Sequence, residues 1–103
     1  MMQTFTRRRI DILVDEPLVE WLVGRAADAG ILHYSVLPVD SGNGRGGHWR
    51  DDDGFGSVAK RMFIAVTNEA KIDALLTRLA PHIEPYGLVI TAYDVQVVRG
   101  ERF

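Results

Sequence analysis

A short strand and a glycine-rich loop meet in the run Val36-Leu-Pro-Val-Asp-Ser-Gly-Asn-Gly-Arg-Gly-Gly-His-Trp-Arg50. Four glycines lie within six positions, and they let the backbone turn sharply and approach a ligand without a Cβ in the way. Successive N–H groups in such a loop can converge on an anion, and the interspersed arginines and histidine add donors suited to phosphate or carboxylate oxygens. The run therefore predicts an anion-binding loop, although the same residues are also compatible with a plain hairpin loop.

Regular elements are expected on both sides of the polar loop, which extends over residues 40–58. Apolar residues alternate in the segments expected to be strands and recur every three or four positions in those expected to be helices. The order is strand, helix, strand before the loop and again after it, over residues 9–14, 15–29, 31–39, 60–67, 68–80 and 89–98. Asp15 and Asn68 are the expected N-caps, and Gly30 and Pro81 the expected helix stops.

The order β-α-β-β-α-β is typical of the ferredoxin-like fold. The expected architecture is α+β, with two helices covering one face of a four-stranded antiparallel sheet. Segments 9–14 and 60–67 are expected at the centre of this sheet and Pro38 at an edge. The other sheet face is expected to carry apolar side chains, namely Leu13, Phe63 and Ala65, and Leu37 or Val98 if the edge strands align. A bare apolar face usually seeks a partner, so the chain is predicted to self-associate as a closed symmetric oligomer.

The composition of the 103 residues excludes several classes of function. A net charge of −2 gives no electrostatic basis for binding nucleic acid or a membrane surface, and no apolar run approaches the ~18 residues of a membrane span. The chain has no cysteine, which excludes disulfides, thiolate zinc sites and thiol catalysis and is compatible with a reducing cytoplasm. We therefore expect one cytoplasmic domain over residues 1–103, with no nucleic-acid partner and no membrane insertion.

Taken together, these features resemble the PII signal-transduction superfamily over nearly the whole chain. The resemblance is carried by Ala29-Gly-Ile, by Ser35-Val-Leu-Pro-Val39, by the Gly-x-Gly-x-x-Gly-His run from Gly42 to His48, and by Val97-Val-Arg-Gly-Glu101. It implies a compact homotrimer that binds adenine nucleotides in clefts between subunits. It also implies that the chain signals through the long loop after the second strand, the T-loop, at about residues 40–58.

The resemblance implies a nucleotide site assembled from several parts of the chain. The loop glycines would face the phosphates, strand residues would line the cleft, and C-terminal arginines would reach the phosphates from the neighbouring subunit. The implied nucleotide-binding residues are Leu13, Ser35, Gly42, Asn43, Gly44, Gly46, Gly47, Lys60, Ile64, Val66, Gly87, Arg99 and Arg102.

Departures from conventional PII proteins favour the PII-like branch linked to inorganic carbon. The segment Pro81–Gly87 lacks the lysine of the usual phosphate loop, which weakens the case for ATP and favours AMP, ADP or a cyclic nucleotide. The T-loop has no glutamine, which weakens the case for 2-oxoglutarate. The stretch Gly-Gly-His-Trp-Arg-Asp-Asp-Asp most resembles the carboxysome-associated form, which implies ADP or AMP with bicarbonate as ligands and a transporter or carboxysome component as partner. Planar guanidinium groups suit bicarbonate, and the candidate anion ligands are Arg45, His48, Arg50 and Arg61.

Two alternative functions accompany this interpretation, and the role of Trp49 has two possible explanations. The run Asp51-Asp52-Asp53, with His48, motivates a divalent-metal-binding trimer similar to the cation-tolerance proteins, although adjacent aspartates lack the alternating spacing of a calcium loop. No Ser/His/Asp constellation has local support, so a nucleotide hydrolase is disfavoured and the chain is predicted not to be an enzyme. Trp49 lies in a polar loop with no core to fill, so it either anchors a partner surface or folds back on its own subunit.

Overall fold

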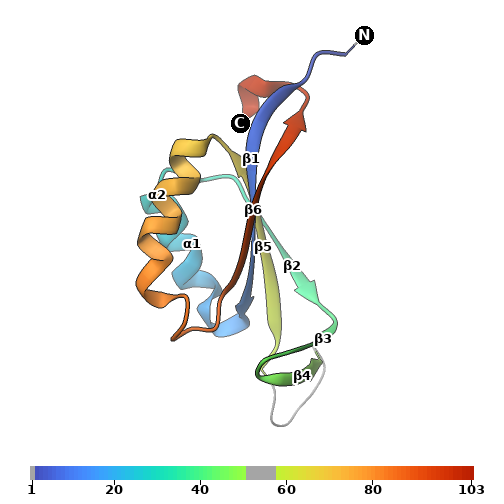
Figure 1. Cartoon of the computed structure of the whole chain (residues 1–103), viewed down its shortest axis with the longest axis vertical. Helices are drawn as coiled ribbons and strands as arrows, with labels where there is room; N and C mark the ends of the chain where they lie inside the picture. The colour runs from blue at the N-terminus through green and yellow to red at the C-terminus, as the bar shows by residue number, and fades with distance from the viewer. Residues whose placement is uncertain (1, 51–57) are drawn as a thin grey trace.

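The computed structural model describes residues 2–50 and 58–103. Within these residues, one four-stranded antiparallel sheet has the strand order β2-β5-β1-β6. Its strands are β1 (Phe5–Asp15), β2 (Ser35–Val39), β5 (Lys60–Thr67) and β6 (Val89–Val97). The helices α1 (Val19–Asp28) and α2 (Glu69–Leu79) both lie on one side of it (Figure 1). The predicted ferredoxin-like α+β fold is confirmed, with β1 and β5 central and Pro38 on an edge strand.

The core lies between this sheet and the two helices. Ile10, Ile12 and Val14 point from β1 toward the helices and are almost fully buried. Opposite them, the helices bury a stripe of apolar residues at helical spacing, which comprises Leu22, Ala26, Ala29, Ile72, Leu75 and Leu79. Ile83 does not extend this stripe and is 36% exposed, because α2 gives way at Pro81 to a short 3-10 helix, η2 (Ala80–His82).

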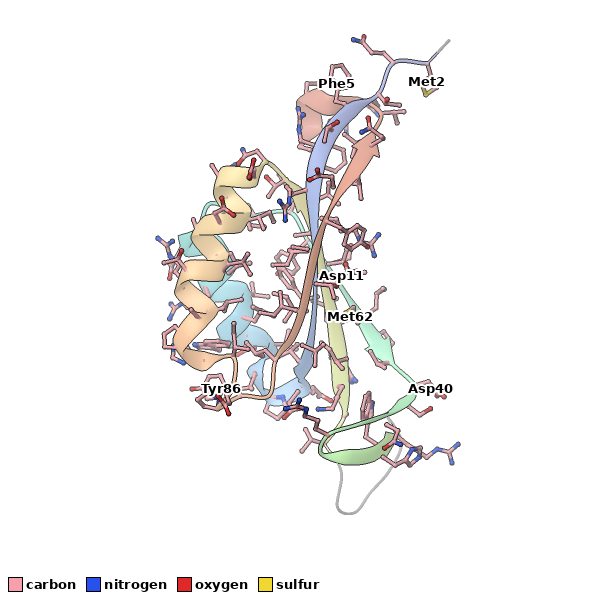
Figure 2. The ribbon with its side chains drawn as sticks, viewed as in Figure 1. Met2, Phe5, Asp11, Asp40, Met62 and Tyr86 are labelled. Atoms are coloured by element: carbon pink, nitrogen blue, oxygen red, sulfur yellow. The ribbon has the colours of Figure 1, made fainter. Side chains whose placement is uncertain are left out.

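The expected contents of the second sheet face are partly wrong. Phe63 and Ala65 pair with Ile12 and Ile10, and directly paired residues lie on the same face of a sheet. Both are therefore buried under the helices. Leu13 does lie on the opposite face, as expected. The pairing register places five further apolar residues on the same face: Leu37, Met62, Ile64, Val66 and Val89. We call this uncovered side of the sheet the open face; Met62 and Asp11 mark it in Figure 2.

Two strands within the T-loop depart from the expected irregular loop. β3 (Ser41–Gly44) and β4 (Gly47–Arg50) pair as an antiparallel hairpin, which we call the glycine hairpin. Arg45 and Gly46 form its turn, and Gly47 adopts a left-handed φ of 102°, which a side chain would disfavour. The run Asp51-Asp52-Asp53 lies outside the described residues.

The ends of the two helices differ in how closely they follow expectation. Gly30 stops α1 with a φ of 86°, and the Asn68 Oδ1 atom accepts a hydrogen bond of 2.9 Å from the Lys71 backbone N–H. Asp15, by contrast, makes no side-chain cap. Its carboxylate turns toward Lys60, and a 3-10 turn, η1 (Glu16–Leu18), precedes α1.

We expect Asn68→Ala to lower the free energy of unfolding by about 1 kcal/mol, because the N-terminus of α2 loses its side-chain acceptor. Urea denaturation followed by circular dichroism measures this change. Asn68→Asp retains an acceptor and should stay within a few tenths of a kcal/mol of the parent. An equal loss in both variants would contradict a capping role.

Candidate functional site

The glycine hairpin is packed by its own tryptophan. Gly42 pairs with Trp49 across the hairpin, and a Cβ built on Gly42 would overlap carbons of the Trp49 ring. A Cβ on Gly44 would lie 3.7 Å from the same ring. Of the two alternatives for Trp49, the structure shows the one in which it folds back on its own subunit. At Gly42, the missing side chain makes room for the indole.

Lys60 and Arg61, two of the predicted ligand cations, are engaged by carboxylates at the base of the hairpin. The Lys60 Nζ atom lies 2.5 Å from Asp15 Oδ1 and 5.2 Å from the centre of the Trp49 ring, a cation–π distance. The Arg61 Nη2 atom lies 3.0 Å from Glu16 Oε2. Both cations are half-buried, so an anion that used either of them would have to compete with a carboxylate already in place.

The remaining candidate anion ligands lie on the solvent side of the hairpin. His48 and Arg50 pair with Asn43 and Ser41, and side chains alternate along a strand. They therefore lie on the hairpin face opposite Trp49, and both are exposed. Arg45 is also exposed, in the turn. This places two guanidinium groups and an imidazole along one short, solvent-facing segment.

The open face carries the predicted strand residues and a polar centre. Leu13, Ser35, Ile64 and Val66 share this face, as their register shows. At its centre, Asp11 accepts a hydrogen bond of 2.8 Å from Arg9 Nε and one of 3.0 Å from the Tyr93 hydroxyl. Desolvation and the bond to Asp11 raise the pKa of Tyr93, and the bond to Asp11 raises the pKa of Arg9. Near neutral pH the phenol therefore stays protonated and the guanidinium stays charged.

A second feature lies at the other end of the sheet. A groove of about 360 Å³ contains Val66 and Arg102, two of the predicted ligand residues. We call it the C-terminal groove. The other residues that line it were not predicted: Gly30, Ile31, Leu32, His33, Thr67, Lys71, Glu101 and Phe103. The motif Ala29-Gly-Ile is the sequence signal for part of this set, since two of its residues, Gly30 and Ile31, line the groove.

The C-terminal turn beside this groove is held against β1. Arg99 adopts a left-handed φ of 58° and starts the 3-10 helix η3 (Gly100–Arg102). The Arg7 guanidinium donates hydrogen bonds of 2.9 Å to the Gly100 carbonyl and 3.2 Å to the Phe103 carbonyl. A Cβ on Gly100 would come within 2.5 Å of the Phe5 ring, so the turn sits directly on β1. Arg99 and Arg102 are exposed on an anchored turn.

The predicted ligand residues therefore divide between two ends of one elongated molecule. The glycine hairpin lies toward one end, together with the parts of β1 and β5 that carry Leu13 and Lys60 and the turn with Gly87 before β6. The C-terminal turn lies at the other end (Figures 1 and 2). Ser35 and Ile64 pair near the middle of the sheet. Since the longest axis measures 50 Å, a single chain cannot place its hairpin and its C-terminal arginines on one small ligand.

Residues 2–50 and 58–103 contain no candidate metal centre and no candidate membrane-spanning helix. These residues contain no group of three or more His, Asp or Glu side chains that could hold a metal ion. The Asp51–Asp53 run of the metal alternative falls outside them. No helix in the described part of the chain is long and apolar enough to cross a bilayer.

Comparison with known proteins identifies relatives of the whole chain. A family model described as nitrogen regulatory protein P-II matches residues 7–102. The structure of CPII, a nitrogen regulatory PII-like protein from Thiomonas intermedia K12 bound to ADP, AMP and bicarbonate, is 24% identical. It superposes with a TM-score of 0.89, and the match covers 100% of this chain and 98% of CPII. Curated proteins gave no match.

Two more distant structures share the fold. A PII-like signalling protein from Thermus thermophilus is 22% identical, with a TM-score of 0.77 and 99% of each chain covered. CutA from Synechococcus elongatus PCC7942 is 15% identical, with a TM-score of 0.56, and the match covers 95% of this chain and 81% of CutA. At these identities the likeness establishes the fold, and the specific ligands of this chain rest on other arguments.

Proposed function

Because the chain belongs to the nitrogen regulatory protein P-II family, we propose that it is a regulatory protein that binds ADP or AMP, together with bicarbonate, in clefts between the subunits of a homotrimer. One observation carries the proposal. The predicted ligand residues lie at two ends of a molecule 50 Å long, so a site that uses both sets requires two copies of the chain.

Each cleft would combine two half-sites. One chain contributes the C-terminal groove, in which Val66 and Arg102 lie beside the backbone of the segment 30–33. Its neighbour contributes the base of the glycine hairpin with Lys60, and Gly87 in the turn before β6. Arginine and lysine side chains from both half-sites would supply the positive charge that the phosphates of a nucleoside diphosphate require. The relative CPII, described as bound to ADP, AMP and bicarbonate, supports this ligand class.

The open face supplies a surface on which the trimer could assemble. Leu37 and Val89, on its two edge strands, are 48% and 57% exposed in the single chain, and Leu13, Met62 and Ile64 lie between them. Burying this continuous apolar surface would favour association. Asp11 is already paired with Arg9 and Tyr93, so the polar centre of the face would enter the interface with its charge compensated.

Bicarbonate would be held by cations of the T-loop. Arg45, His48 and Arg50 project from the exposed side of the hairpin, and Arg61 lies at its base beside Glu16. Ligand binding would order the T-loop and change its docking to a transporter or carboxysome component, so that the protein regulates inorganic carbon uptake or carboxysome function in the cytoplasm. The role requires binding and conformational change without covalent chemistry, and we propose that the protein is not an enzyme.

We expect a solution mass of about three times 11.5 kDa by light scattering, and calorimetric heat on titration with ADP or AMP that increases when bicarbonate is present. ATP and cyclic AMP serve as comparison ligands. A mass equal to one chain, or the absence of heat with every adenine nucleotide, would refute the proposed function. Binding of ADP that bicarbonate leaves unchanged would refute the bicarbonate part alone.

A further inference from the structure

The Trp49 ring fills the space beside Gly42 through which a ligand could approach the backbone. Glycine allows a ligand to approach the backbone because it has no Cβ. In this structure, a Cβ on Gly42 would overlap the Cη2 and Cζ2 atoms of Trp49, so the open side of this glycine is filled by the indole. An anion that approached Gly42 from this side would have to displace the ring.

The same ring lies next to a cation that is also committed elsewhere. Lys60 Nζ is 5.2 Å from the centre of the Trp49 ring and 2.5 Å from Asp15 Oδ1. An ammonium over an aromatic face is attracted to it, and a carboxylate at this distance forms a charge-assisted hydrogen bond. Lys60 is thus shared between a side chain of the hairpin and the end of β1.

The contacts around Asp15 tie this arrangement to the sheet. The Glu16 backbone N–H donates a hydrogen bond of 2.8 Å to the Ala59 carbonyl, one residue before Lys60. The carboxylate of Glu16 pairs with Arg61, one residue after it. The end of β1 is therefore fastened on both sides of Lys60, whereas the hairpin meets Lys60 through the Trp49 ring. Trp49 therefore contacts Lys60 without a hydrogen bond, whereas Asp15 forms one.

We propose that Trp49 and Asp15 compete with the nucleotide phosphates for the base of the hairpin. The indole covers Gly42 and the carboxylate holds Lys60, and phosphate binding releases both contacts. This inference rests on the proposed function, because it takes the base of the hairpin as the phosphate half-site. Release of the indole lets the hairpin leave its present packing and take the conformation that the bound ligand orders, so occupancy of the cleft becomes a change in hairpin conformation.

Trp49 is itself the reporter for the test. The Trp21→Phe variant leaves Trp49 as the sole tryptophan. Titration with ADP should shift its emission to longer wavelength as the indole enters water, with the same midpoint as the calorimetric binding curve. If Trp21→Phe does not form the parent oligomer, fluorine NMR of wild-type protein labelled with 5-fluorotryptophan gives the same readout, with Trp49→Phe used to assign the resonance.

Asp15→Asn separates competition from a merely structural contact. Removal of the competing carboxylate should tighten ADP binding about two- to fivefold, the factor that corresponds to a partly exposed ion pair. Loss of a purely structural contact would weaken binding or leave it unchanged. Asp28→Asn is the matched control, since it removes the same charge from an exposed pair with Arg25 on α1 and should leave the affinity unaltered.

The outcomes distinguish this inference from the proposed function. Unchanged Trp49 emission while ADP binds, or an Asp15→Asn affinity no higher than that of Asp28→Asn, would overturn the competitor role and leave nucleotide binding intact. If no adenine nucleotide binds, the proposed function fails, and pyrophosphate then decides the inference as a bare diphosphate probe. A shift of Trp49 emission with pyrophosphate supports the competitor role, and an unchanged emission overturns it.

Discussion

Leu37→Asp should convert the proposed homotrimer into single chains and reduce ADP affinity about 100-fold or more. Leu37 lies on edge strand β2 with its side chain on the open face, 48% exposed, and it pairs with Met62. A carboxylate at this position stays hydrated in the single chain, so the fold should tolerate it. In the proposed trimer it would lose its water against apolar surface, at several kcal/mol per buried ion. Because each nucleotide cleft needs two adjoining chains, dissociation would also remove the clefts.

Light scattering and calorimetry on the same samples measure both effects. Ile83→Asp is the matched control, because Ile83 is also partly exposed but lies after α2, away from the open face. It should keep the trimer mass and the ADP affinity of the parent. A Leu37→Asp protein that remains trimeric would show that the open face is not the interface, and a monomer that binds ADP with parent affinity would show that the cleft is not shared.

Several features predicted correctly from the sequence depend on local chemistry. Gly30 ends a helix because a residue in the left-handed conformation is needed there. Asn68 caps a helix by accepting a hydrogen bond from the backbone N–H of Lys71, three residues along the chain. Pro38 marks an edge strand because it cannot donate to a ladder. Each of these signals lies within a few residues of the structure that it specifies, and none requires knowledge of the tertiary contacts.

The failures concern features that several segments decide together. Both faces of the segment 60–67 are apolar, so alternation alone could not assign Phe63, and the register with β1 decides it. The glycine hairpin lacks apolar alternation, and its pairing brings Trp49 onto Gly42. The C-terminal groove joins residues near positions 30, 66 and 102, which come together only after folding.

Arg102→Gln should lower the affinity of the proposed homotrimer for ADP about 10- to 100-fold, because a charge-assisted bond to phosphate contributes roughly 1.5–3 kcal/mol. Lys60→Met should have an effect of similar size from the other half-site. Arg25→Gln is the control, since this exposed arginine pairs with Asp28 on α1, outside both half-sites. Affinities from calorimetry that fall equally in all three variants would indicate a general charge effect.

Trimers that mix the two defective chains test the shared cleft directly. Where the Arg102→Gln chain contributes the groove and the Lys60→Met chain contributes the hairpin base, both defects fall in one cleft. Where the Lys60→Met chain contributes the groove and the Arg102→Gln chain contributes the hairpin base, the cleft is intact. Every mixed trimer contains one such intact cleft, so it should bind one ADP with the affinity of the parent. Mixed trimers, isolated through two different affinity tags, that show no such recovery would place both residues in one chain's own site. The division of the predicted ligand residues between two ends of a 50 Å chain argues for recovery.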